Sequence, residues 1–304
     1  SVIERLKGRM AIGHNRYSTT GDVVLRNVQP LFADLDTCGF AVGHNGNLTN
    51  WRELREELFT IDRRHINTNS DSEVLLNVYA HELQRAATGP ELSQDEVFEA
   101  VAAVHRRARG AYAVVSQIAN FGLVAFRDPN GIRPLCLGRN VTPKGEEWMV
   151  ASESVALTGC GFELVRDVEP GEAIIIDLDG NLSSRQCAEN PRLNPCVFEY
   201  VYFARPDSTV DGVSVYDARL LMGEYLAENV AKCWQLAAVM KRRAGRLPEE
   251  TTRRADNERI KRYVAKLTIK SKIVPASAWR NLPTFSPVAP VNAPATWPNS
   301  SLSS

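Results

Sequence analysis

The sequence has no long apolar run and few cysteines, and both absences narrow the class of protein. No stretch of about 18 apolar residues occurs, so we expect no helix that spans a membrane. Residues 1–5 lack the apolar core of a secretory signal. Six cysteines among 304 residues are too few for a disulfide-stabilised scaffold. These features predict a cytoplasmic globular protein with reduced thiols.

The sequence also lacks net charge, but its charges are unevenly distributed. Residues 1–240 hold 23 Lys and Arg against 32 Asp and Glu, whereas residues 241–273 hold 12 against 4. Residues 274–304 carry one charge, Arg280, and six prolines. We therefore expect a folded acidic body, a basic segment and a disordered Pro/Ala/Ser-rich tail. The basic segment contains one aromatic residue, Tyr263, and no recognisable nucleic-acid reader, so we expect a solvated cationic helix and no nucleic-acid partner.

Periodicity predicts both helices and strands in the body. Helices are expected over residues 51–59 and from Ser70 and Ser93, where residues 70–73 and 93–96 have the capping-box spacing and Gly110 would end the last helix. Five short β-rich runs follow, at residues 111–118, 122–128, 134–139, 147–154 and 173–179. Their connections are too short for crossover helices, so the strands should pair antiparallel and give an α+β protein.

Three polar segments, residues 13–21, 43–50 and 67–73, have the composition of loops at strand ends. Arg16 offers a guanidinium fork that suits a carboxylate. Asn45 and Gly46 offer a side-chain amide and an N–H that could hold an oxyanion, and Asp71 offers a carboxylate that could bind an ammonium group. Each has a plainer interpretation: a surface arginine, an Asn-Gly turn and a helix-start acid. The histidines lack metal-ligand spacing, so we expect no metal site; they are His14, His44 and His65.

Taken together, these segments resemble the glutamine site of N-terminal-nucleophile amidotransferases. The segments FRDPNGIRPLCLGR (126–139), VASESVAL (150–157), RDVEPGEAIII (166–176) and CVFEYVYFARPDS (196–208) are similar to those of amidophosphoribosyltransferases. The similarity runs from about residue 8 to about residue 231. It implies a partial four-layer αββα sandwich of antiparallel sheets. It also implies that Arg16 binds the glutamine α-carboxylate, that Asp71 binds its α-amino group, and that Asn45 and the Gly46 N–H form the oxyanion hole.

The resemblance also implies a reaction and a division into domains. The family transfers ammonia from glutamine to phosphoribosyl pyrophosphate in de novo purine biosynthesis, and it gives 5-phosphoribosylamine, glutamate and pyrophosphate. Magnesium serves the second site, the family forms homo-oligomers, and a loop over residues 16 to about 26 closes on glutamine. Residues 1–195 would be a partial glutaminase domain, 196–240 the start of a phosphoribosyltransferase domain and 241–304 a non-matching tail.

The sequence departs from this family in two places. The family's nucleophile is an N-terminal cysteine, whereas Ser1 here precedes a segment that resembles the interior of the glutaminase domain, and none of the six cysteines obviously replaces it. The family's phosphate loop has no counterpart, because residues 177–180 have the pattern of a hairpin. We therefore expect an inactive fragment of the enzyme. The alternative is a non-catalytic module that binds glutamine or another subunit.

For Cys196, the question is whether it could bind an iron–sulfur cluster. Cys196 corresponds to a ligand of the [4Fe–4S] cluster that some family members carry. A cluster takes four ligands, and the segment that would supply the others in the family has no match in this sequence. We therefore expect no cofactor in this chain.

Overall fold

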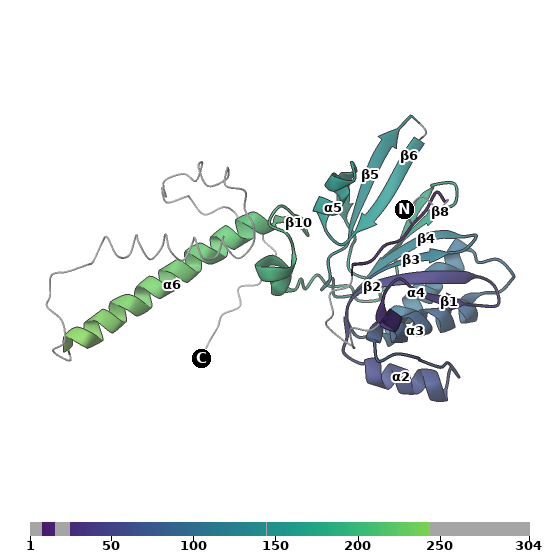
Figure 1. Cartoon of the computed structure of the whole chain (residues 1–304), viewed down its shortest axis with the longest axis horizontal. Helices are drawn as coiled ribbons and strands as arrows, with labels where there is room; N and C mark the ends of the chain where they lie inside the picture. Colours follow the sequence, from purple (N-terminus) through teal and green to yellow (C-terminus); the bar gives the residue numbers. More distant parts are fainter. Residues whose placement is uncertain (1–7, 16–24, 144, 244–304) are drawn as a thin grey trace. The chain divides into compact units, whose positions relative to one another are not determined.

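The computed structural model describes residues 8–15, 25–143 and 145–243 (Figure 1). The chain divides into two units, residues 1–219 and 220–304. The predicted disordered tail, residues 274–304, lies outside the described residues. None of the described helices is long and apolar enough to cross a membrane.

The first unit is built on a six-stranded antiparallel sheet with the strand order β1-β2-β3-β4-β8-β9. The antiparallel pairing expected from the short connections is confirmed. Residues 177–180 form the expected turn, in which the Gly180 N–H donates to the Asp177 carbonyl at 3.0 Å. The strands are β1 (Leu31–Asp34), β2 (Gly39–Leu48), β3 (Gly110–Ile118), β4 (Gly122–Arg127), β8 (Glu172–Asp177) and β9 (Leu182–Gln186).

Helices α3 and α4 cover one face of this sheet, and α2 packs beside α3 (Figure 1). They span Trp51–Thr60 (α2), Asp71–Ala86 (α3) and Gln94–Arg107 (α4). Side chains alternate along each strand, so residues such as Val114 and Phe126 point to the helices and join Val78 and Val101 in the main hydrophobic core. The predicted helices are therefore placed by burial of their apolar stripes.

The two predicted capping boxes have different outcomes. At Ser93 the box is complete, because the Ser93 hydroxyl and the Glu96 carboxylate each accept the other residue's backbone N–H. At Ser70 the prediction is wrong: the hydroxyl accepts from Ser72, and Glu73 turns to the preceding loop. Gly110 is also not the end of a helix, since α4 stops at Arg107 and Gly110 opens β3.

A second, three-stranded antiparallel sheet has the order β6-β5-β7 and carries helix α5. Its elements are β5 (Cys136–Thr142), β6 (Gly145–Ala151), β7 (Glu163–Asp167) and α5 (Ser154–Gly159). Leu135, Leu137 and Val168 pack against Ala125 and Ile174 of the first sheet, which joins the two sheets face to face. The layers are therefore helices, sheet, sheet and helix, and the predicted αββα arrangement is confirmed.

Short elements flank this sandwich in the chain. A one-turn helix η1 (Leu25–Asn27) precedes β1, and η2 (Glu199–Phe203) precedes the two-stranded pair β10 (Thr209–Val210) and β11 (Val213–Ser214). Helix α6 (Val215–Arg243) follows directly.

Candidate functional site

The Asn45-Gly46 pair lies inside strand β2, although sequence reasoning placed it in a loop. Residues 43–48 pair in continuous register with β3, with Asn45 opposite Ala113 and Gly46 opposite Tyr112. Gly46 has a φ of 142°, and a Cβ atom there would overlap the carbonyl oxygen of Ala111. Only glycine fits this backbone, so the Asn-Gly sequence serves a close approach of two strands rather than a turn.

The Asn45 side chain faces a cavity between the two sheets. This cavity has a volume of about 1180 Å³, and Asn45 shares its lining with His14, Asn15, Ser152 and Glu153. The Asn45 amide nitrogen donates to the Ser152 hydroxyl at 3.5 Å. A neutral donor therefore points into a space large enough for a small polar substrate.

Asp71 opens helix α3 and is bonded to the same strand. Its carboxylate Oδ2 accepts the Leu48 N–H at 3.0 Å, and only 3% of the residue is exposed. Asp71 is thus bonded to Leu48, which lies two residues after Gly46 in β2. The dipole of helix α3 also favours the negative charge of Asp71 at its first position. Asp71 is not among the described residues that line the inter-sheet cavity, whereas Asn45 is.

A buried group of three polar side chains fixes the start of this strand segment, and sequence reasoning did not find it. Gln29 accepts the His44 N–H at 2.7 Å, and its amide donates to the Ser72 hydroxyl at 3.1 Å. Ser72 Oγ lies 3.0 Å from His44 Nδ1. Burial, together with the nearby His14 and Arg133, lowers the pKa of His44 to about 3. The imidazole is therefore neutral, and the Ser72 hydroxyl can donate to its Nδ1 atom.

The loop before α3 is held by Glu73. Its two carboxylate oxygens accept the N–H groups of Asn67 at 2.8 Å and Thr68 at 2.6 Å. Because Ser70, Asp71, Ser72 and Glu73 are all buried, the whole helix entry is packed rather than exposed. Of the polar residues 67–73, Asn67 and Asn69 are exposed, whereas Thr68 and residues 70–73 are buried beside β2.

Arg16 and Ser1 lie outside the described residues, as does most of the predicted closing loop. The cysteines can be placed for the most part: Cys136 and Cys187 are buried, Cys38 and Cys196 are partly buried, and Cys160 is exposed. Burial raises the pKa of Cys136 to about 12 and that of Cys187 to about 11. Neither buried thiol has the depressed pKa of a nucleophile.

Comparison with known proteins matches residues 14–159 to a model of the glutamine amidotransferase domain. Residues 14–159 are thus similar to a glutamine amidotransferase domain. The chain is 55% identical over 234 residues to the amidophosphoribosyltransferase of Escherichia coli (strain K12), a match that covers 77% of this chain and 46% of that protein. It is 44% identical over 234 residues to the Saccharomyces cerevisiae amidophosphoribosyltransferase, with 76% and 46% covered.

A solved structure agrees with this domain assignment. Glutamine phosphoribosylpyrophosphate amidotransferase from B. subtilis, complexed with ADP and GMP, matches with a TM-score of 0.58 and 34% identity. The match covers 71% of this chain and 43% of that one. The resemblance predicted from the sequence is confirmed, and the chain spans less than half the length of these relatives.

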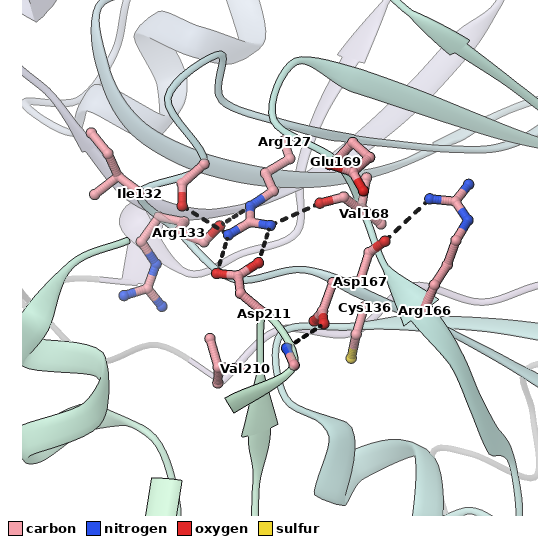
Figure 2. A network of polar contacts seen from close by, with 12 residues as sticks. Arg127, Ile132, Arg133, Cys136, Arg166, Asp167, Val168, Glu169, Val210 and Asp211 are labelled. Carbon is pink, nitrogen blue, oxygen red and sulfur yellow. Dashed lines mark hydrogen bonds and ion pairs between the residues drawn. The ribbon is translucent and has the colours of Figure 1, made fainter. Parts of the chain in front are cut away.

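The FRDPNGIRP segment of the amidotransferase domain has a structural role that its sequence did not reveal. Figure 2 shows the buried Arg127 guanidinium at the centre of a network of polar contacts. It forms two hydrogen bonds with the Asp211 carboxylate, at 2.7 and 2.9 Å. Its other bonds go to backbone carbonyls of Gly131, Arg133 and Val168 at 2.6 to 2.8 Å. All five donors of the side chain are used.

This network joins three separate parts of the chain. Arg127 ends β4, Val168 follows β7, and Asp211 lies in the turn between β10 and β11. Burial opposes the charge of Arg127, but the Asp211 carboxylate outweighs it and raises the arginine pKa. The ion pair therefore fixes the β10–β11 hairpin to the sandwich.

Proposed function

We propose that this chain is the glutamine-binding part of an amidophosphoribosyltransferase of purine biosynthesis. The observation that carries the proposal is the Asn45 side chain, which faces the inter-sheet cavity next to a glycine whose backbone excludes every other residue. In this proposal Asn45 and the Gly46 N–H hold the oxygen of the glutamine amide. An amide and an N–H at fixed positions suit an oxygen that gains negative charge during hydrolysis.

Asp71 would bind the α-amino group of glutamine, and Arg16 its α-carboxylate. Asp71 is held by the Leu48 N–H, so its orientation is set before a ligand arrives. Closure of the loop from residue 16 would exclude water from the cavity. The residues of the chain thus bind and orient glutamine by charge at one end and by neutral donors at the other.

The complete reaction would use ammonia from glutamine to displace pyrophosphate from phosphoribosyl pyrophosphate, in a cytoplasmic homo-oligomer with magnesium at the second site. A [4Fe–4S] cluster does not fit the described part of the chain. A cluster takes four ligands. The described residues contain no group of three or more His, Cys, Asp and Glu that could hold a metal ion. Cys196 on its own would supply one thiolate, so no step is assigned to a cluster.

Binding of glutamine to the purified chain by calorimetry, with release of glutamate measured alongside, tests the proposal. We expect glutamine to bind and Asp71→Asn to weaken binding by roughly tenfold or more, because asparagine keeps an oxygen for the Leu48 N–H but removes the charge. Asp95→Asn, which changes another acid in the first turn of a helix, is the matched control. A folded chain without affinity for glutamine would overturn the proposal.

A second function, glutamine binding without hydrolysis, is favoured by the raised thiol pKa of the two buried cysteines, Cys136 and Cys187. Glutamate release separates the two functions. Release that disappears in Asn45→Ala would establish hydrolysis in this cavity. Binding that persists with no release would establish a binding module.

A further inference from the structure

A second pocket lies beside helix α2, and it shares no lining residue with the inter-sheet cavity. Its volume is about 520 Å³, within the range of small-molecule sites. Helix α2 forms one side, and residues 64–66 form the other. The apolar part of the lining comes from Trp51, Phe59 and Ile66, of which Phe59 is 66% exposed.

The charged side chains of the lining are mostly positive. Arg52, Arg55 and Arg64 line the pocket together with His65, against one acid, Glu56. Within the part of the chain that the structure describes, neither Arg52 nor Arg55 forms an ion pair.

Two acids close to the pocket in sequence, Glu57 and Asp62, form ion pairs with Arg107. Arg107, from α4, binds Asp62 at 2.8 Å, Glu82 at 2.8 Å and Glu57 at 3.4 Å. Two of these acids, Glu57 and Asp62, belong to the end of α2 and the turn that follows it. With Glu57 and Asp62 paired to Arg107, the lining holds one carboxylate, Glu56, against three arginines, so the pocket keeps an excess of positive charge.

The backbone after α2 turns sharply to complete the pocket. Arg63 has a φ of 58°, a left-handed conformation that residues other than glycine rarely adopt. The turn lets the Arg64 N–H donate to the Leu58 carbonyl at 2.8 Å, which returns the chain onto the helix. The Arg64 side chain donates to Gln84. Desolvation by burial lowers the pKa of Arg64, and the nearby Asp62 carboxylate opposes this shift.

We propose that this pocket binds a small molecule that contains both a planar ring and a phosphate monoester. Guanidinium groups form paired hydrogen bonds with phosphate oxygens. The Trp51 and Phe59 rings offer apolar surface to a planar ring, and Arg52 lies 5.3 Å from the Trp51 ring centre, as in a cation–π contact. Both a nucleoside monophosphate and a phosphorylated ring cofactor have this chemistry. The site is independent of glutamine binding.

Titration of the full chain at low ionic strength, followed by NMR at the Trp51 indole and the backbone of α2, tests the proposal. The probes are uridine monophosphate, pyridoxine 5′-phosphate, inorganic phosphate and uridine. We expect at least one ring phosphate to bind roughly tenfold more tightly than both phosphate and uridine, because ring and charge are both used. The ring phosphate that binds more tightly identifies whether the ligand is a nucleoside monophosphate or a phosphorylated ring cofactor. Binding should weaken as salt screens the arginines, of which Arg52 is exposed and Arg55 and Arg64 are half-buried.

Substitutions locate the site. Arg55→Ala should weaken binding of the ring phosphate by roughly tenfold, since it removes a charged hydrogen-bond donor. Arg106→Ala is the matched control, because it removes an equal charge from an exposed pair with Glu99 on α4. Any of three results would overturn the proposal: no binding of either ring phosphate, binding no tighter than that of inorganic phosphate, or equal losses in the two variants.

Discussion

The Nδ1 atom of His44 lies 3.0 Å from the hydroxyl oxygen of Ser72. This contact joins the residue before the Asn45-Gly46 pair to the residue after Asp71, across 28 positions of sequence. Gln29 bonds to both partners and closes the group. Strand β2 and the start of α3, which together carry the described residues of the proposed glutamine site, are therefore held against each other by buried hydrogen bonds.

Ser72→Ala should lower the free energy of unfolding by about 1–3 kcal/mol, because it leaves buried groups of Gln29 and His44 without a partner. Ser116→Ala is a matched control. Ser116 is fully buried, and its hydroxyl has no hydrogen-bond partner within the described ranges. Its removal should be neutral or stabilising. Urea denaturation of both variants measures the difference, and equal losses would contradict the role given to Ser72.

Acid should destabilise the chain through His44. Its folded-state pKa is lowered to about 3, whereas an unfolded histidine titrates near about 6.5. Below that pH the unfolded state takes up a proton that the folded state does not, so stability falls as pH drops from about 6.5 toward 3, by up to about 1.4 kcal/mol per pH unit. Burial also lowers the pKa of His105 to about 4, so this residue adds a similar dependence of stability on pH.

Denaturation curves at pH 7, 6 and 5 separate the two histidines. His44→Gln should reduce the pH slope by about one proton and leave the part due to His105. An unchanged slope in His44→Gln would show that His44 is already accessible to protons in the folded state.

The sequence predicted the elements of this fold better than the site between them. Amphipathic periodicity located α3 and α4, and short turns predicted the antiparallel pairs, because both signals are local. The Asn45-Gly46 pair was assigned to a loop since local preference favours a turn there. Its true conformation depends on Ala111 and Tyr112, which lie more than sixty positions away.

The hydrogen bonds that organise the site were equally invisible to sequence reasoning. Gln29 lies between η1 and β1, His44 lies in β2 and Ser72 lies in α3, and no spacing rule relates them. The helix-start interpretation of Asp71 was correct for its location, but its bond to Leu48 required the tertiary structure. The roles of Asn45, Gly46, Asp71 and Arg16 toward glutamine remain predictions.

Gly46→Ala should be among the most damaging single changes in β2. The new methyl group would overlap the Ala111 carbonyl, and the φ of 142° is unfavourable for alanine. Conformational strain alone accounts for about 1–3 kcal/mol, and the overlap adds to it. Gly89→Ala is the control, because a Cβ atom there meets nothing within 4 Å. Chemical denaturation of the two variants checks the contrast, which would be refuted by similar stabilities.

Arg127→Met should lower the free energy of unfolding by about 3–5 kcal/mol, because it leaves the Asp211 carboxylate buried without its partner. Replacing both residues, as Arg127→Met with Asp211→Leu, should recover part of that loss. The exposed pair Arg139–Glu146 gives the control, and Arg139→Ala should cost less than about 1 kcal/mol. A double variant less stable than Arg127→Met would show that the hairpin depends on Asp211 for other contacts.

Alkylation should distinguish the cysteines by their environment. Thiolates react with iodoacetamide, so the exposed Cys160 should be modified first at pH 8, while Cys136 and Cys187 react only when the chain unfolds. Mass spectrometry of peptides, with and without urea, gives the order. A catalytic attack on glutamine would need the same accessible thiolate. Early modification of Cys136 or Cys187 in the folded chain would therefore restore that cysteine as a candidate nucleophile, whereas the expected order removes both.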